Sequence, residues 1–218
     1  MLCRSGVKKL TFIDPDRVEL SNLPPQLLYD TADVGRLKVE AAAARLAGNG
    51  LELEPIAERL TEANAYALMS RHDVVLDCCD HPPTKFLINR VAVRTGHPFC
   101  YAGLSRTGGL ALTVNPGVSP CLACVFPEPA SAGEAGSRDF GCHETGIVAP
   151  VAAALGSYQA LQALGALGLR EAHDAGRLAV YQLRGRRWQF IDFKRDSRCG
   201  VCGVARTEEF RRIDPCHS

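Results

Sequence analysis

Two pairs of cysteines, each with two residues between its members, constrain this chain more than any other sequence feature. Cys121 and Cys124 form the first pair, and Cys199 and Cys202 form the second. Four thiolates at about 2.3 Å around one tetrahedral zinc ion make a closed structural site, which leaves no open position for catalysis. Because the pairs lie too far apart for an autonomous finger, a shared metal would join two distant parts of the fold. The alternatives are surface cysteines or two redox dithiols.

The rest of the composition is that of an ordinary globular protein. The chain has 218 residues, 46% of them hydrophobic, and a formal net charge of +1. This near-neutral balance argues against nucleic acid or a membrane surface as the partner. Arg4, Lys8 and Lys9 interrupt the N-terminus, so no signal peptide is expected. We therefore expect a cytoplasmic protein whose ten cysteines are metal ligands or free thiols.

Strand and helix patterns alternate over the first half of the chain. The apolar runs predict strands over 7–13, 51–56 and 72–77, and the helical patterns cover 36–47, 62–70 and 82–94. A further helix is expected to start near Ser21. Gly96 is expected to end the helix predicted over 82–94. Such alternation is typical of a mostly parallel sheet with crossover helices, which is an α/β fold.

The second half of the chain follows a different pattern. Strands are predicted near 98–103, 109–114, 178–183 and 188–193, and a long loop over 127–141. Gly146 to Leu169 carries no charge and is long enough to cross a membrane, which is one reading of this segment. Its Ala, Gly and Gln content favours the other reading, a buried helix. We expect a nucleotide-binding part over 1–116, a zinc-bearing lobe over 117–203 and a polar tail over 204–218.

Several motifs occur in an order that resembles one enzyme family. The segment LTFIDPDRVELSNLPPQ covers Leu10 to Gln26, GRLKVE begins at Gly35, DCCD spans 77–80, and CHETG begins at Cys142 between the two cysteine pairs. Together they resemble the ThiF/MoeB/HesA adenylyltransferases, bacterial relatives of ubiquitin-activating enzymes. The resemblance covers about residues 6 to 203. It implies a Rossmann-like sheet with a C-terminal zinc lobe.

The family resemblance also implies an activity. Its members use ATP and Mg²⁺ to adenylate the C-terminal glycine carboxylate of a small ubiquitin-like sulfur carrier that ends in Gly-Gly, with release of pyrophosphate. The carrier would be of the thiamin or molybdopterin type. The enzyme would be a homodimer, or a heterodimer with a complete family member.

Five residues are the candidates for the nucleotide site. Asp14 and Asp16 follow a predicted strand, where an acid can accept hydrogen bonds from ribose hydroxyls; the alternative is that they are turn acids. By family position, Asn22 and Lys38 would lie near the phosphates, where a lysine can stabilise the charge that develops during adenylation. Asp80 follows the next strand, and a carboxylate there suits Mg²⁺.

The cysteines near these motifs receive different assignments. Cys142 is predicted to precede the apolar helix, where the helix dipole would favour a thiolate. In the ThiF branch of the family, the matching cysteine transfers sulfur to the carrier or links to it covalently; the alternative is an inert loop thiol. Asp77 is expected to be structural, and Cys78 and Cys79 are expected to be core residues beside the sheet.

The chain departs from the family pattern in three places. The glycine-rich turn that usually precedes the first acidic strand has no counterpart, because Gly6 is the only glycine before Asp14. The expected fold therefore lacks the first strand and that turn. Pro25 stands where the family has arginine, and His81 and Lys85 replace Asn and Arg. Two other hypotheses follow: a non-catalytic module that docks a carrier or a complete subunit, and a generic dinucleotide oxidoreductase.

Overall fold

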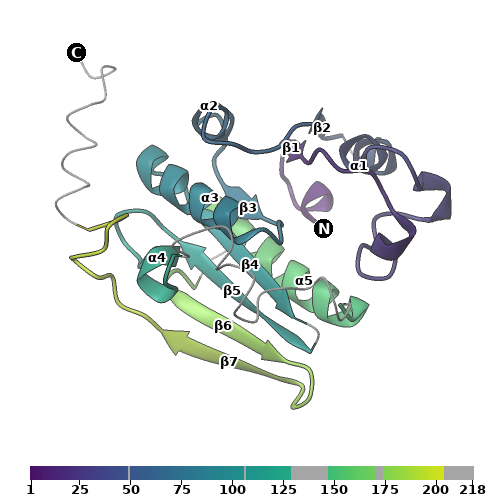
Figure 1. Ribbon diagram of the computed structural model, residues 1–218. Helices are drawn as coiled ribbons and strands as arrows, with labels where there is room; N and C mark the ends of the chain where they lie inside the picture. The colour runs from purple at the N-terminus through teal and green to yellow at the C-terminus, as the bar shows by residue number, and fades with distance from the viewer. Residues whose placement is uncertain (49, 106, 129–146, 170–173, 204–218) are drawn as a thin grey trace.

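The computed structural model describes residues 1–48, 50–105, 107–128, 147–169 and 174–203. Its strands form two sheets (Figure 1). The smaller sheet pairs β1 (Lys9–Ile13) with β2 (Glu52–Ile56) in parallel. The larger sheet has the order β3 (Val75–Asp77), β4 (Phe99–Ser105), β5 (Gly108–Val114), β6 (Arg177–Gln182) and β7 (Arg187–Asp192). Within the described ranges, β3 and β7 are the two edge strands of the larger sheet.

The helices lie largely where the sequence predicts them. They are α1 (Lys38–Leu46), α2 (Ala65–Met69), α3 (Pro82–Thr95), α4 (Leu122–Val125) and α5 (Ala149–Ala166), with single 3₁₀ turns at Leu2–Arg4, Leu20–Asn22 and Thr31–Asp33. The helix expected to start near Ser21 is wrong, because only a 3₁₀ turn forms there. Gly96 does end α3, and its φ of 73° is a left-handed conformation that favours glycine.

The α/β class and the Rossmann-like arrangement predicted from the sequence are confirmed. β1 pairs with β2 in parallel, and β3 pairs with β4 in parallel. In each pair, a crossover helix lies between the two strands in the chain. The pairings β4–β5, β5–β6 and β6–β7 are antiparallel. The connections from β4 to β5 and from β6 to β7 are turns of a few residues, which can join only antiparallel strands, whereas β6 follows β5 after a long connection that contains α4 and α5. The larger sheet is therefore a mixed sheet whose parallel end faces the two-stranded sheet (Figure 1).

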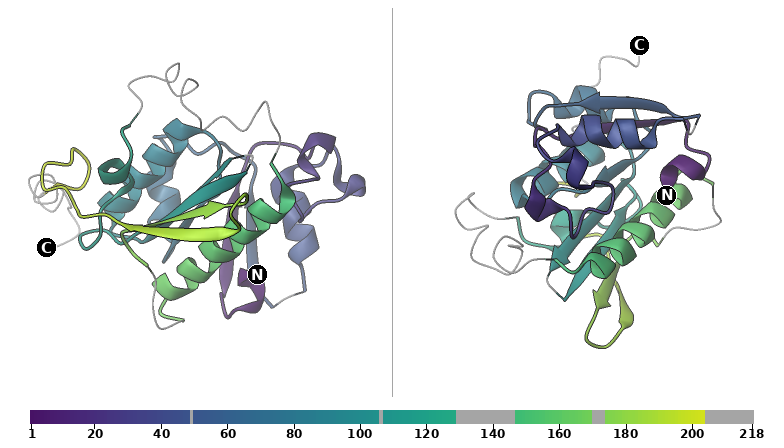
Figure 2. Two further views of the ribbon diagram at one scale, coloured as in Figure 1. Left: turned by 90° about the horizontal axis from the view of Figure 1, so that it is seen from below. Right: turned by 90° about the vertical axis from the view of Figure 1, so that its right-hand side faces the viewer.

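Helices cover both faces of the larger sheet (Figure 2). On one face, Leu112 of β5 and Leu178 of β6 pack with Phe86 of α3 and Leu122 of α4. On the other face, Ala111 and Ala179, together with Leu155 of α5, form a second cluster. Since side chains alternate along a strand, neighbouring residues of β5 and β6 reach opposite clusters. The central strands are consequently buried on both sides, which explains their continuous apolar runs.

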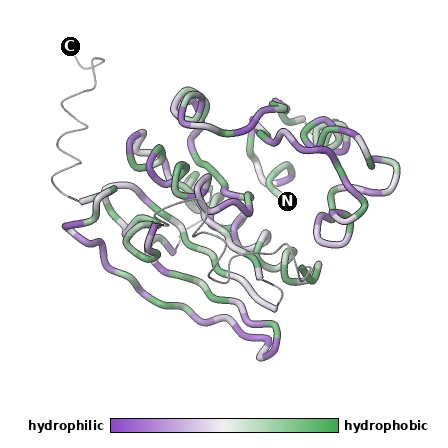
Figure 3. The backbone as a smooth tube through the Cα atoms, in the orientation of Figure 1, coloured by the Kyte–Doolittle hydropathy of each residue, from purple (hydrophilic) through white to green (hydrophobic). Residues whose placement is uncertain are grey.

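The uncharged segment 146–169 supplies α5, and its buried-helix reading agrees with the packing. Leu155 and Ala163 are almost completely buried against the sheet. Within the described residues, no helix is both long and apolar enough to span a bilayer. Hydrophobic colouring follows α5, β4 and β5, whereas the turn between β6 and β7 is hydrophilic (Figure 3).

Charged pairs line the exposed side of the two-stranded sheet. Lys9 of β1 lies 2.9 Å from Glu52 and 3.0 Å from Glu54 of β2. Glu54 also pairs with Arg71 at 2.8 Å and accepts a hydrogen bond from Thr11. The hydrogen bond from Lys9, followed by Thr11 and the charge of Arg71, lowers the pKa of Glu54 to about 2. The ionised carboxylate is thus favoured in the folded state.

Replacing Glu54 with glutamine is expected to change how stability depends on acid. The folded-state pKa of Glu54 is about 2, below its ordinary value of 4.5, so its ionisation stabilises the fold fully above pH 4.5. This contribution is lost as the pH falls from 4.5 towards 2. Urea unfolding of the wild type and E54Q should differ at pH 7 and converge near pH 2. A difference that stays constant across this window would contradict the prediction.

Candidate functional site

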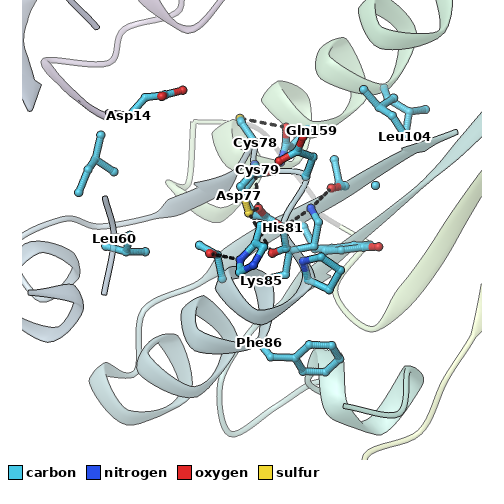
Figure 4. A pocket seen from close by; sticks show the side chains of 18 of the residues that line it. Asp14, Leu60, Asp77, Cys78, Cys79, His81, Lys85, Phe86, Leu104 and Gln159 are labelled. Atoms are coloured by element: carbon cyan, nitrogen blue, oxygen red, sulfur yellow. Dashed lines mark hydrogen bonds and ion pairs between the residues drawn. The ribbon is translucent and has the colours of Figure 1, made fainter. Parts of the chain in front are cut away.

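A cavity of about 880 Å³ opens between the two sheets, at the carboxyl ends of β1 and β3. In Figure 4, Asp14 stands on one side of the pocket, and the turn that follows β3 stands on the other with Lys85 and Gln159. Apolar side chains complete the wall, among them Leu60, Phe86, Leu104, Phe126 and Leu155. A crevice outside the carboxyl ends of parallel strands is the usual ligand site of an open α/β sheet.

Lys38 joins the two acids that follow β1. It is the first residue of α1, and its ammonium lies 3.2 Å from Asp16 and 3.9 Å from Asp14. The backbone N–H of Lys38 also donates to the Asp16 carbonyl at 2.9 Å. The Asp14 carboxylate accepts the N–H of Asp16, which closes the turn between them. Three residues singled out from the sequence therefore meet at one wall of the cavity.

The turn after β3 is held by a buried ion pair. Asp77 is fully buried, and its carboxylate accepts a hydrogen bond from the Lys85 ammonium at 2.9 Å. Its other oxygen accepts from the backbone N–H of Cys79 at 3.1 Å and from the Cys79 thiol at 2.8 Å. Lys85 also donates to the carbonyl of Ala102 at 2.8 Å and lies over the ring of Tyr101. The structural role expected for Asp77 agrees with this geometry.

Gln159 of α5 supports the same turn from the opposite face of the sheet. Its amide nitrogen donates to the carbonyls of Asp77 at 2.8 Å and Cys100 at 2.7 Å. Its amide oxygen faces the thiol of Cys78 (Figure 4). The end of β3 and the first half of β4 are therefore held by side chains from two helices, Lys85 of α3 and Gln159 of α5.

The remaining candidates fall in three different places. Asp80 lies on the cavity wall, three residues after the clamped Asp77. Asn22 does not line the cavity; its side-chain oxygen accepts the N–H of Glu19 and caps a 3₁₀ turn. Cys142 lies outside the described residues. The structure thus brings Asp14, Asp16, Lys38 and Asp80 to one cavity and leaves Asn22 apart.

The expectation that Cys78 and Cys79 are core residues is wrong. Cys78 is exposed and Cys79 is only partly buried, and both line the cavity. The strand ends at Asp77, so the next two residues belong to the turn and not to the sheet. Desolvation and the adjacent Asp77 charge raise the pKa of the Cys79 thiol well above its usual range. The raised pKa agrees with the geometry, in which the Cys79 thiol donates a hydrogen bond to the Asp77 carboxylate.

The two cysteine pairs converge on one point. Cys121 lies 4.0 Å from Cys124 and 3.7 Å from Cys199, and Cys124 lies 3.4 Å from Cys202, measured between Sγ atoms. All four sulfurs lie within 4.8 Å of one another. These separations are too long for disulfides, whose bond is about 2.05 Å. They match the sulfur–sulfur edges of a tetrahedron with metal–sulfur distances of about 2.3 Å, so the four residues fit a zinc ion.

Three sulfurs of the cysteine cluster differ in their electrostatic surroundings, because the pKa is lowered at Cys202 and raised at Cys121 and Cys124. The hydrogen bond from Cys121 lowers the pKa of Cys202 to about 4. The same hydrogen bond with Cys202 raises the pKa of Cys121. The side chain of Asn89 acts in the opposite direction and lowers the pKa of Cys121. The N–H of Val201 also points at the sulfur of Cys199 at 3.4 Å. Backbone and side-chain donors around the sulfurs are what a thiolate–metal cluster requires.

Sequence reasoning missed the supporting role of three residues: Lys85, Gln159 and Asn89. Lys85 attracted attention only as a replacement for arginine, although a cation one helical turn into α3 can reach back to the strand end. Gln159 was visible as a polar residue in an otherwise apolar helix, and buried polar groups usually have a structural partner. Asn89 gave no sequence signal beyond being polar within an apolar stretch of α3.

Comparison with known sequences identifies the relatives of this chain. The ThiF family matches residues 1–201. The chain is 38% identical to the adenylyltransferase and sulfurtransferase MOCS3 of Sus scrofa, over 93% of this chain and 44% of that protein. It is 34% identical to a sulfur carrier protein adenylyltransferase of Thermus thermophilus, over 95% of this chain and 78% of that protein. The chain thus spans less than half the length of the mammalian relatives it matches.

Comparison with solved structures gives the same fold at lower identity. E. coli MccB with MccA-N7isoASN superimposes with a TM-score of 0.76 at 22% identity, covering 92% of this chain and 62% of that one. MccB crystallised with ATP gives 0.75 at 22% identity, over 92% of this chain and 61% of that one. At this identity the likeness shows the fold alone.

Proposed function

Because the chain belongs to the ThiF family, we propose that it catalyses ATP-dependent adenylation of a small ubiquitin-like sulfur-carrier protein. The substrate group is the C-terminal glycine carboxylate of a carrier ending in Gly-Gly, of the thiamin or molybdopterin type. The observation that carries the proposal is that Lys38, paired with Asp16 after β1, and Asp80, after β3, line one cavity. The names of the bacterial and mammalian relatives point in the same direction.

The residues of the cavity would have different roles in this reaction. A carboxylate oxygen of the carrier attacks the α-phosphorus of ATP, the bond from that phosphorus to the bridging oxygen breaks, and pyrophosphate leaves. Asp14 and Asp16 would accept hydrogen bonds from the ribose hydroxyls. Lys38 would stabilise the charge that accumulates on the α-phosphate. Mg²⁺, for which the Asp80 carboxylate is the proposed ligand, would neutralise phosphate oxygens.

The carrier would enter along the part of the cavity lined by the second half of the chain. Leu122, Phe126 and Leu155 form an apolar wall there. This supports the division into a nucleotide-binding part over 1–116 and a zinc- and carrier-binding part over 117–203. We place Cys142 in the step after adenylation, where it would take part in sulfur transfer to the carrier or in a covalent link with it. The assembly we propose is a homodimer, or a heterodimer with a complete family member, in the cytoplasm.

The decisive experiment is ATP–pyrophosphate exchange with purified carriers. Exchange of labelled pyrophosphate into ATP should require Mg²⁺ and a carrier with an intact C-terminal glycine. A carrier whose terminal glycine has been removed serves as the matched control and should give no exchange. If folded, metal-loaded protein binds the carrier but supports no exchange with any Gly-Gly carrier, the chain is a docking module, a reading that Pro25 in place of arginine would favour.

We further propose that the four cysteines bind one structural zinc ion. Removing one ligand with C199A is expected to lower the zinc content from about one per chain to near zero, because three thiolates hold the ion far less tightly than four. The melting temperature should fall as well, since the cluster joins α4 to the segment after β7. Zinc content is measured by mass spectrometry after dialysis.

The matched control is C79A, which removes a thiol that lies outside the cluster. It should keep the full zinc content. Wild-type protein with far less than one zinc per chain, or C199A with the zinc content and stability of the wild type, would contradict the zinc proposal.

A further inference from the structure

The side chain of Asn89 on α3 is fully buried. One of its two polar atoms has a hydrogen-bond partner among the described residues, and the other has none. Its Oδ1 accepts the backbone N–H of Leu122 at 2.9 Å. Its Nδ2 has no hydrogen-bond acceptor in the part of the chain that the structure describes. A buried donor without a partner costs about 1–3 kcal/mol. Such a group in an otherwise well-packed core indicates an acceptor that is stronger in another state of the protein.

The orientation of the Asn89 amide follows from its one hydrogen bond. Leu122 is the first residue of α4, so its N–H has no acceptor within that short helix. Only the amide oxygen can accept this N–H, which directs Nδ2 away from Leu122. Cys121 is the residue immediately before Leu122, so the hydrogen bond from Leu122 places the Asn89 amide next to that cysteine. Cys121 is fully buried as well, which keeps water away from this region.

We propose that Asn89 is a positioning residue of the metal site, with its Nδ2 donating an N–H···S hydrogen bond to the metal-bound thiolate of Cys121. The inference rests on the four-cysteine metal site proposed above. A thiolate carries a full negative charge and accepts a hydrogen bond much more strongly than a neutral thiol does. Metal binding would therefore supply the acceptor that Nδ2 lacks. Donors of this kind orient metal ligands and adjust their affinity.

The same side chain links the metal site to the cavity. Asn89 lies four residues after Lys85 on α3, so both side chains project from one face of the helix. Lys85 holds Asp77 in the turn that carries Asp80. On its other side, Asn89 fixes Leu122, which lines the cavity. One amide on α3 is therefore hydrogen-bonded to the residue that follows Cys121.

Metal affinity of an Asn89→Asp variant tests the inference. Aspartate keeps the oxygen that accepts the Leu122 N–H but replaces the donor with a charged oxygen beside the thiolates. We expect Co²⁺, titrated against a competing chelator and followed by its thiolate charge-transfer absorption, to bind about 10- to 100-fold more weakly. The matched control is Q162E, which changes a buried amide away from the cluster and should bind Co²⁺ as the wild type does. Wild-type affinity in N89D would overturn the inference.

A second measurement needs no variant. In wild-type protein loaded with ¹¹³Cd²⁺, a side-chain proton of Asn89 should show scalar coupling to the metal through the N–H···S–Cd path. Absence of this coupling in a loaded, folded sample would overturn the inference even if N89D failed to fold. Failure of the wild type to bind Co²⁺ or Cd²⁺ at all would instead refute the metal site itself, so the two failures are distinguishable.

Discussion

Replacing Asp80 with alanine is expected to lower carrier-dependent ATP–pyrophosphate exchange by at least about 100-fold, the scale of losing one preorganised charged group from a transition state. Asp80 lies on the cavity wall directly after the clamped end of β3. Without its carboxylate, a Mg²⁺ ion bound at the phosphates would lose its proposed protein ligand. The exchange rate is measured at saturating ATP and carrier.

The fold of D80A should survive, because Asp80 is exposed and lies outside β3 and α3. The matched control is D73A, which removes an exposed carboxylate just before the other end of β3. D73A should retain exchange close to that of the wild type. Equal exchange in D80A and wild type, with both proteins folded by circular dichroism, would remove Asp80 from the proposed mechanism.

Replacing Lys85 with methionine is expected to destabilise the fold by about 3–5 kcal/mol, because it leaves a buried charge without its partner. Asp77 is 0% exposed, and Lys85 is its only cationic neighbour at 2.9 Å among the described residues. The three hydrogen bonds that the Asp77 carboxylate accepts come from Lys85 and Cys79, and the variant removes the strongest. Urea unfolding at pH 7 measures the loss.

Two further variants isolate the cause of this loss. In the double variant D77N/K85M the buried charge is absent, so much of the lost stability should return. K38M removes the other lysine of the cavity, whose partners Asp14 and Asp16 are partly exposed, and should cost about 1 kcal/mol or less. The main effect of K38M should be a lower rate of ATP–pyrophosphate exchange. K85M and K38M with equal losses of stability would contradict the assignment of separate roles.

Most of the fold could be predicted from local patterns. Alternating apolar runs and helical repeats located β1 to β7 and the long helices within a few residues, because both types of element are buried on predictable faces. The helix expected at Ser21 failed because its capping residues bond only locally, and Asn22 caps a single 3₁₀ turn. The antiparallel pairing of β4 with β5 and of β6 with β7 follows from short connections, whereas the pairing of β5 with β6 joins strands that are distant in the chain and leaves no local signal.

The site was predictable only in part. Acids near strand ends pointed to Asp14 and Asp80, which line the cavity, and the cysteine spacing pointed to the four sulfurs that lie together in the fold. The clamp formed by Lys85 and Gln159 could not be predicted, since its partners lie on elements that meet only in the folded chain. For the same reason, the exposure of Cys78 depends on where β3 ends.

The four-cysteine cluster also imposes an order on how the protein is made. Cys121 and Cys199 are 78 residues apart in the chain. At about 5–20 residues per second, a ribosome needs roughly 4–16 s to travel from one to the other. Throughout that interval the first two thiols wait without their partners, exposed to oxidants and to capture of stray metal ions. The proposed zinc ion could therefore be held by all four sulfurs only after the second cysteine pair has been made, which places its insertion late in biosynthesis.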